Sequence, residues 1–366
     1  MTKHTLDLDL VHPASVQYGN ALHGLAIGDA WGFQVEFLDY DKMPHPVPMP
    51  KGVWRVSDDT QMTLALQNAV DTIQFLETGG NTEKDIKDTE KLITDEFIRW
   101  EQSPLNDRAP GTTCTSSIRA LSKSGRRWFE VSSRSAGCGA VMRLLPTVVA
   151  SASRWRGLTA LQAVITHNNP MAVASALVLG EVARLFASDY THDDQFAQSP
   201  IEVAKSIAED MSHSRYYVGY QDAYLRSVLK PELTTAHGGS LASYLQKGAD
   251  GLLLSSLTAA SNLMTKSRKT GTPADSNDIC ASVGEGWDAA TCVALSTLAA
   301  TLYYYTNDAT RSLEWAVTSN GDSDSIGAVA GMLIGLTSRD SDFWPHEGVE
   351  PVFEDAYQSQ LLVPKT

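Results

Sequence analysis

Apolar residues recur every three or four positions along much of this chain, and this spacing constrains the fold more than any other feature of the sequence. One face of a helix is traced after Thr60 by Met62, Leu66, Ala69, Ile73 and Leu76. The same spacing recurs within 293–302 and 326–333, whereas strand-like alternation is nearly absent. The segment 171–187 is apolar on most sides, which is typical of a helix buried among other helices. We therefore predict an all-α fold.

The chain of 366 residues is long enough for one large domain, and its 43% hydrophobic content is enough for a substantial core. Two polar stretches, 188–199 and 267–278, are predicted to be loops, and neither is typical of an interdomain linker. The pattern between them is mixed and indicates a helical insertion at about 190–280. The simplest interpretation is a single compact multi-helix domain over residues 1–366 that carries this insertion.

Charge and composition exclude several classes of partner. The opening residues contain no apolar run of signal-peptide length, and no window approaches the roughly 18 apolar residues of a membrane-spanning helix. The four cysteines have neither CxxC spacing nor the density of a disulfide scaffold, so we expect a soluble, cytoplasmic protein, and a monomer. The net charge of -14 argues against binding nucleic acid or an anionic membrane through a basic patch. Phosphates on a substrate must then be held by cations or by backbone N–H groups.

Two short acidic motifs stand near opposite ends of the chain, SDDT at 57–60 and GDSDS at 321–325. Carboxylate and hydroxyl oxygens are the ligands that Mg²⁺ and Mn²⁺ prefer, and adjacent carboxylates are costly to keep ionised unless a cation neutralises them. Each motif also precedes a helical pattern, and Ser, Thr and Asp are favoured at helix N-termini, so helix capping explains either motif taken alone. Their occurrence together with the segments below favours a metal site.

Glycines at 24, 28 and 32 recur every four residues in the segment GLAIGDAWG. This spacing gives a helix a groove without side chains, where another helix or a ligand can approach closely. Each glycine costs about 1 kcal/mol relative to alanine in a helix, so the run indicates a packing requirement. Glu36 follows the segment and is either a solvated loop carboxylate or a catalytic group.

Two further segments are suited to holding an anion. SAGCGAVMR at 135–143 is a run of small residues that leads into a segment predicted to be an apolar helix. Its N–H groups can cradle a phosphate or a ribose, and an ordinary tight turn is the alternative. In THNNP at 166–170, Asn169 is predicted to cap a helix that begins at Pro170. His167 then lies just outside this helix start, as a hydrogen-bonded bystander or as a contact to an anion.

Taken in order, these segments resemble those of the ADP-ribosylglycohydrolase family, which includes dinitrogenase reductase-activating glycohydrolase and the eukaryotic ADP-ribosyl-arginine and ADP-ribosyl-serine hydrolases. The resemblance covers about 19–336 and is weakest at 190–280. It rests on the motifs GLAIGDAWG, SDDTQMTLAL, SAGCGAVMR, THNNP, GEGW and NGDSDSIGAVAG. It implies a compact all-α domain that holds a dinuclear centre of two Mg²⁺ or two Mn²⁺ ions.

The resemblance also assigns roles to individual residues. The metal ligands that it implies come from both ends of the chain and are Ser57, Asp58, Asp59, Asp322, Asp324 and Ser325. Glu36 matches the family's loop glutamate, which is a general acid/base or a gate over the metals. The residues expected to contact ADP-ribose are Ser135, Gly137, Cys138, Gly139 and His167. In GEGW, Trp287 is interpreted mainly as a core residue.

One position departs from the family pattern. The family commonly has Asn-Gly where this chain has Cys138-Gly139. An asparagine can hydrogen-bond a ribose hydroxyl, whereas cysteine is a weak donor and acceptor. We therefore expect a different substrate affinity or linkage preference, with loss of activity as the alternative.

The activity that the resemblance implies is metal-dependent hydrolysis of the bond between ADP-ribose and an acceptor. The substrate expected first is an ADP-ribosylated protein modified on arginine, and the second is a small ADP-ribose conjugate. Two cations can orient the ribose hydroxyls and lower the pKa of a bound water, while Glu36 or Asp324 takes or gives a proton. Two alternatives stay open: a non-catalytic ADP-ribose-binding module and a metal-dependent nucleotide phosphohydrolase.

Overall fold

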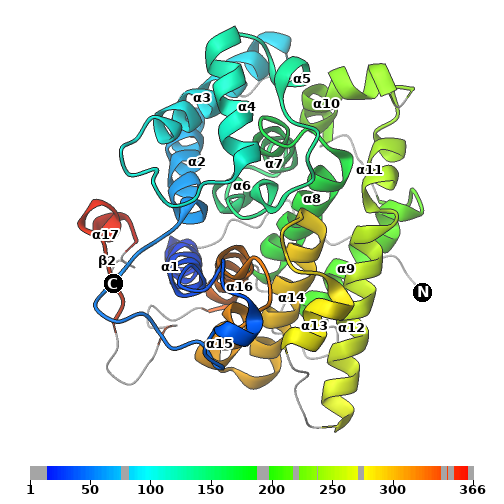
Figure 1. Cartoon of the computed structure of the whole chain (residues 1–366). Coiled ribbons are helices and arrows are strands. Elements are labelled where there is room, and N and C mark those ends of the chain that lie inside the picture. Colours follow the sequence, from blue (N-terminus) through cyan, green and yellow to red (C-terminus); the bar gives the residue numbers. More distant parts are fainter. Residues whose placement is uncertain are drawn as a thin grey trace.

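The computed structural model describes residues 15–75, 82–187, 198–216, 222–236, 238–270, 276–338, 344 and 350–361. This part of the chain is all-α, as predicted, with helices packed on one another throughout (Figure 1). Its two strands have two residues each, β1 (Val53–Trp54) and β2 (Val352–Phe353), and pair in parallel. None of the described helices combines the length and the apolar character that crossing a membrane requires.

The helices follow one another with short connections. Those of the first half are α1 (Ser15–Gly32), η2 (Tyr40–Lys42), α2 (Asp58–Phe75), α3 (Glu83–Glu101), α4 (Thr112–Ser124), α5 (Trp128–Val131), η3 (Cys138–Ala140), α6 (Leu145–Val148), α7 (Trp155–Val164) and α8 (Pro170–Phe186). Those of the second half are α9 (Pro200–Ser212), α10 (Ala223–Ala236), α11 (Leu241–Ala249), α12 (Leu252–Thr270), α13 (Ser276–Val283), α14 (Ala289–Thr306), α15 (Ala309–Val317), α16 (Ser323–Thr337) and α17 (Asp355–Leu361). The periodic segments thus form α2, α14 and α16, as predicted.

The closest helix contact joins the two ends of the sequence. Helices α1 and α16 lie side by side near the centre of the molecule (Figure 1). A Cβ atom on Gly28 would lie 2.0 Å from the carbonyl oxygen of Gly327, and a Cβ on Gly331 would lie 1.9 Å from that of Gly24. Because no side chain fits between these backbones, the groove predicted from the glycine spacing is confirmed, and a helix fills it. The contact brings the end of α1 beside the start of α16.

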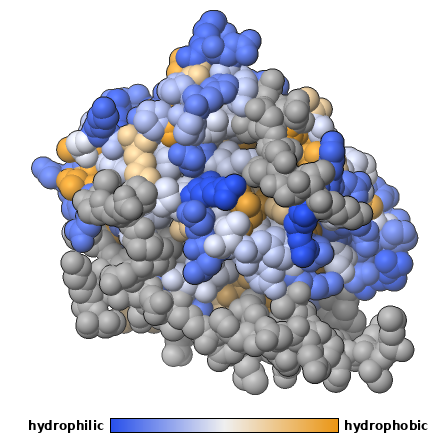
Figure 2. Space-filling view, turned by 90° about the horizontal axis from the view of Figure 1, so that it is seen from below, coloured by the Kyte–Doolittle hydropathy of each residue, from blue (hydrophilic) through white to orange (hydrophobic). Residues whose placement is uncertain are grey.

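The region 190–280 packs on the rest of the molecule through α9, α11 and α12. These helices contact α8 and α14, and their buried side chains belong to the same hydrophobic core. Its interpretation as an insertion stays a prediction, and residues 188–197 of the first predicted loop lie outside the described residues. Among the coloured residues in Figure 2, the molecular surface is mostly hydrophilic, with hydrophobic residues in small separate patches.

Two local predictions are wrong. The second predicted loop is mostly helical, since α12 continues to Thr270 and α13 begins at Ser276. Its polar residues form a solvated helix face, where the Arg268 guanidinium packs 4.2 Å from the centre of the Tyr305 ring. The small-residue run leads into the three-residue η3 and the four-residue α6, instead of a long apolar helix. Pro146 sits in the first turn of α6, where its missing N–H is tolerated. By contrast, Asn169 caps α8 as predicted and accepts a hydrogen bond from the Met171 N–H.

Candidate active site

The two acidic motifs meet at one cavity of about 250 Å³. Its lining includes Asp58 and Asp59 from the first turn of α2, and Asp322, Asp324 and Ser325 from the start of α16. The close contact between α1 and α16 makes this meeting possible, because α16 starts beside the end of α1. The two ends of the sequence therefore lie at one site, as the resemblance implied.

Three carboxyl groups at this site lie especially close together. One oxygen each from Glu36, Asp322 and Asp324 can be chosen so that all three lie within 4.8 Å of one another. Asp322 and Asp324 are buried, whereas Glu36 is half-buried. Asp58 and Asp59 line the same cavity but stand outside this tight group. Glu36 is thus placed among the implied metal ligands, close enough to share a cation or a proton with them.

Ser57 takes a different place from the other implied ligands. It is fully buried and does not line the cavity. Its Oγ accepts a hydrogen bond from the Asp59 N–H at 3.2 Å, so in this structure it caps the start of α2. A helix cap and a metal ligand use the same hydroxyl oxygen, and its two lone pairs allow both.

Burial and mutual repulsion make the acidic cluster electrostatically costly. Burial, followed by the charge of Asp324, raises the pKa of Asp58 to about 7 and that of Asp59 well above its usual range. The same two causes raise the pKa of Asp322 and of Glu36. The residues that line the cavity include no lysine or arginine to offset this charge. A site that keeps so many carboxyl groups together is one in which cations are the natural counter-charge.

Asp29 is a functional candidate that the sequence analysis missed. It is fully buried in α1, and its carboxylate accepts hydrogen bonds from the backbone N–H groups of Ser57, at 2.9 Å, and Thr60, at 3.0 Å. The Thr60 hydroxyl donates to it as well. Asp29 therefore holds the first turn of α2, which carries Asp58 and Asp59. The available signal was a single charged residue inside the apolar, glycine-rich segment 24–32, since such a residue needs polar partners when buried.

The glycines of the small-residue run are required by close contacts. A Cβ on Gly137 would lie 3.1 Å from Nε2 of His167, and a Cβ on Gly139 would lie 2.8 Å from Sγ of Cys114. The run is also held by backbone hydrogen bonds on both sides. Asn168 N–H donates to Ser133 at 2.7 Å, and Ala289 N–H donates to Ala136 at 2.8 Å. The implied ADP-ribose contacts Ser135, Gly137, Cys138, Gly139 and His167 all line the same cavity as the acidic cluster.

His167 is neutral and buried instead of being an exposed loop residue. Burial, followed by the charge of Arg143, lowers its pKa to about 3. The Thr166 hydroxyl accepts a hydrogen bond from Arg143 at 2.6 Å and lies 2.8 Å from Nδ1 of His167. This arrangement directs the threonine proton to Nδ1, which leaves the imidazole proton on Nε2, facing the glycine run. His167 can therefore offer a ligand one neutral N–H donor.

Cys138 lies between the acidic cluster and the small-residue run. The Ser325 hydroxyl is 3.7 Å from its Sγ, and its own N–H donates to the carbonyl of Trp287 at 3.1 Å. Burial, followed by the charge of Asp322, raises the pKa of the Cys138 thiol well above its usual range. The side chain is therefore a neutral thiol at the position where the family commonly has asparagine.

The interpretation of Trp287 as a core residue is wrong. Its side chain is 44% exposed, lines the cavity and stacks on Phe37. Gly286, just before it, has a φ of +86°, and Asp288, just after it, caps α14. This tight turn presents the indole at the cavity mouth, and no periodic pattern in the sequence reports such a turn.

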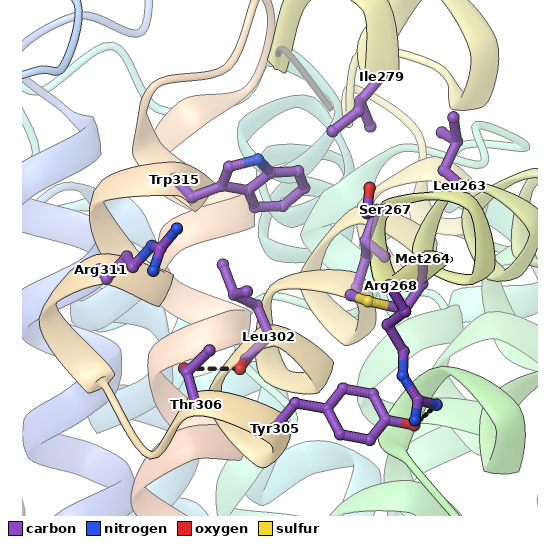
Figure 3. A pocket seen from close by; sticks show the side chains of 11 residues that line it. Leu263, Met264, Ser267, Arg268, Ile279, Leu302, Tyr305, Thr306, Arg311 and Trp315 are labelled. Carbon is purple, nitrogen blue, oxygen red and sulfur yellow. Dashed lines mark hydrogen bonds between the residues drawn. The ribbon is translucent and has the colours of Figure 1, made fainter. Parts of the chain in front are cut away.

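A second cavity, also of about 250 Å³, lies between α12, α13, α14 and α15 (Figure 3). Its walls are mainly apolar, with Trp315 and Leu302 facing it, and the cationic side chains Arg268 and Arg311 stand at its edges (Figure 3). No carboxylate is among its lining residues. It lacks the oxygen ligands that Mg²⁺ or Mn²⁺ needs, so the acidic cavity is the candidate active site.

Comparison with known proteins gives a consistent picture. A family model described as ADP-ribosylglycohydrolase matches residues 17–339. The chain is 33% identical over 175 residues to ADP-ribosyl-dinitrogen reductase glycohydrolase of Rhodospirillum rubrum, over 44% of this chain and 55% of that protein. It is 28% identical over 193 residues to ADP-ribosylarginine hydrolase Tri1 of Serratia proteamaculans (strain 568), over 48% and 49% of the two chains. The chain thus spans about half the length of these curated relatives.

A solved structure supports the same fold. It is described as an ADP-ribosylglycohydrolase-related protein complex, and it matches 88% of this chain and 87% of its own with a TM-score of 0.53. The sequence identity is 20%, so this likeness shows the fold alone.

Proposed function

Since the chain belongs to the ADP-ribosylglycohydrolase family, we propose that it hydrolyses the glycosidic bond between ADP-ribose and the arginine of an ADP-ribosylated protein, with two Mg²⁺ or Mn²⁺ ions at the acidic cluster. The observation that carries the proposal is the cluster itself, which gathers Asp58, Asp59, Asp322 and Asp324 from both ends of the chain around one cavity. The names of two relatives support the arginine linkage and the modified-protein substrate.

The donor atoms of the cluster fit divalent cations. Oδ2 of Asp59 and Oδ2 of Asp322 are buried and accept no hydrogen bond from the described residues. A buried carboxylate oxygen without a partner is costly, and coordination to a cation removes that cost. All the implied ligands offer hard oxygen atoms, which Mg²⁺ and Mn²⁺ prefer over nitrogen or sulfur. The ligands would be Asp58, Asp59, Asp322, Asp324 and the two serine hydroxyls at 57 and 325.

When bound, the cations supply positive charge that orients ribose hydroxyls and makes a nearby water more acidic. The protein's own contribution is position and proton transfer. Glu36 is half-buried beside Asp324, and its raised pKa lets its carboxyl group hold a proton. A protonated carboxyl group next to the scissile bond can donate to the leaving nitrogen, and Asp324 can accept a proton from the attacking water.

The other wall of the cavity is suited to the ADP-ribose moiety. The Nε2–H group of His167 and the backbone of the small-residue run face the space beside the cluster. These groups can donate hydrogen bonds to the diphosphate or ribose without adding a full positive charge. This division of roles explains how an acidic protein can accept an anionic substrate.

The test is mass-spectrometric detection of free ADP-ribose from arginine-modified and serine-modified peptides, with Mg²⁺ and with EDTA. We expect release from the arginine-modified peptide that needs Mg²⁺ and is lost in Asp322→Asn. ADP-ribose binding without release would instead identify a binding module, an outcome for which the thiol of Cys138 is the structural motive. Release of AMP or inorganic phosphate would identify a phosphohydrolase. Hydrolysis that persists unchanged in EDTA would refute the metal-dependent mechanism.

A further inference from the structure

Two exposed aromatic rings stand at the mouth of the acidic cavity. Phe37 is 65% exposed and Trp287 is 44% exposed. Their ring centroids are 6.4 Å apart and their planes differ by 20°, which makes them the stacked ring pair of the described residues, where the other recorded pairs are edge-to-face. Core packing does not explain this pair, because both rings leave a large apolar area in water.

The chain holds both rings in place from opposite sides of the cavity. Phe37 lies in the turn after α1, where the Leu38 N–H donates to the Val35 carbonyl at 2.8 Å. Trp287 is tied to the small-residue run, because its carbonyl accepts a hydrogen bond from Cys138. A rigid aromatic surface of this kind can bind a flat group with little loss of entropy.

The position of the pair indicates which part of the substrate it meets. Glu36 belongs to the tight carboxyl group with Asp322 and Asp324, and Phe37 follows it in the chain, one Cα step of about 3.8 Å away. The pair therefore lies next to the atoms that would carry out the bond cleavage. In an ADP-ribosylated protein, the group at that place is the acceptor, whereas the adenine is separated from the reacting carbon by two riboses and a diphosphate.

Charge at the cavity mouth selects among flat groups. Glu36 precedes Phe37, the exposed Glu285 lies two residues before Trp287, and no lysine or arginine lines the cavity. Aromatic faces attract cations, and tryptophan does so most strongly. A guanidinium group is planar and always charged, and it pairs readily with carboxylates. The surroundings of the two rings thus match a guanidinium better than a neutral group.

We propose that Phe37 and Trp287 form the acceptor subsite and bind the guanidinium of the modified arginine against their rings. This proposal rests on the proposed function and names the residues that select its acceptor. A serine acceptor has no planar cation to place there, so the pair favours arginine linkages over serine linkages.

The first test compares Trp287→Ala and Phe37→Ala with the wild type on arginine-modified and serine-modified peptides. We expect kcat/KM for the arginine-modified peptide to fall about 3- to 30-fold in each variant. Any activity on the serine-modified peptide and the affinity for free ADP-ribose should stay near wild-type values, and Trp287→Phe should retain most of the arginine activity. Phe75→Ala removes another exposed ring, 86% exposed at the end of α2, and is the matched control. Equal losses on both peptides, or weaker ADP-ribose binding, would overturn the proposal, the latter by placing adenine on the rings.

The second test does not depend on turnover, so it separates this proposal from the proposed function. The Mg²⁺-loaded wild type with ADP-ribose is titrated with N-ethylguanidine, and the NMR signal of the Trp287 indole N–H is followed. That signal is assigned by its absence in Trp287→Phe. We expect it to shift with N-ethylguanidine and to stay in place with the uncharged N-ethylurea. If the wild type cleaves neither peptide, the proposed function fails and this titration alone decides. Absence of a shift, or equal shifts with both probes, would overturn the acceptor subsite.

Discussion

Replacing Asp322 with asparagine removes one charge from the acidic cluster with little change in shape. The nearest carboxyl oxygens of Asp322, Glu36 and Asp324 lie within 4.8 Å of one another. Two full charges at that distance repel by about 3.5 kcal/mol at an effective dielectric constant of about 20. Protonation relieves part of this repulsion when no cation is bound. We therefore expect D322N to be more stable than the wild type in EDTA by about 1–2 kcal/mol, which is a rise in Tm of about 2–4 °C.

Divalent cations should reverse this order. At a Mg²⁺ concentration about 100 times its Kd, a protein that binds one Mg²⁺ only when folded gains about 2.7 kcal/mol, or about 5 °C in Tm for a chain of this size. D322N lacks one ligand and should gain less than about 1 °C. Differential scanning calorimetry with EDTA and with Mg²⁺ measures both effects, and Asp250→Asn, at an exposed carboxylate that ends α11, should follow the wild type in both. A D322N variant that melts below the wild type in EDTA, or that keeps the full Mg²⁺ shift, would refute this reasoning.

Three further substitutions test other parts of the site and fold. Asp29→Asn removes the charged acceptor that holds the first turn of α2, so unfolding should become easier by about 2 kcal/mol and Mg²⁺ affinity by calorimetry should fall, whereas unchanged affinity would exclude this positioning role. Gly28→Ala forces a Cβ to within 2.0 Å of the Gly327 oxygen and should cost about 3 kcal/mol in urea unfolding, whereas Gly111→Ala, with open space around it, should cost less than about 0.5 kcal/mol. Cys138→Asn adds a hydrogen-bonding amide beside the cluster and should lower the Kd for ADP-ribose about 2- to 10-fold, and an unchanged Kd would show that this position does not contact the ribose.

Much of the fold could be predicted because it depends on local periodicity. Helices α2, α14 and α16 follow from apolar residues spaced three and four apart, and the start of α8 follows from the cap at Asn169. The contact between α1 and α16 also left a local trace, since glycines four residues apart in α1 permit it. The acidic cavity was predictable only through the family resemblance, because spacing along the chain does not report that residues about 265 positions apart will meet.

The features that were missed depend on tertiary contacts. Asp29 finds its partners about 30 residues further along, so a helix pattern alone does not reveal its role. Trp287 was assigned to the core from its residue type, but the positive φ of Gly286 turns it to the cavity mouth. Arg268 was placed in a loop from composition, but its contact with Tyr305 keeps it in α12. In each case the deciding interaction lies outside the window in which sequence patterns are informative.

The most direct test of the central claim is anomalous diffraction from crystals grown with Mn²⁺. We predict two anomalous peaks in the acidic cavity, each within coordination distance of carboxylate oxygens from the group Asp58, Asp59, Asp322 and Asp324. Two peaks there would establish that this chain holds a dinuclear centre built from both ends of its sequence. Absence of peaks at these carboxylates, or Mn²⁺ bound only elsewhere, would contradict the metal-dependent site.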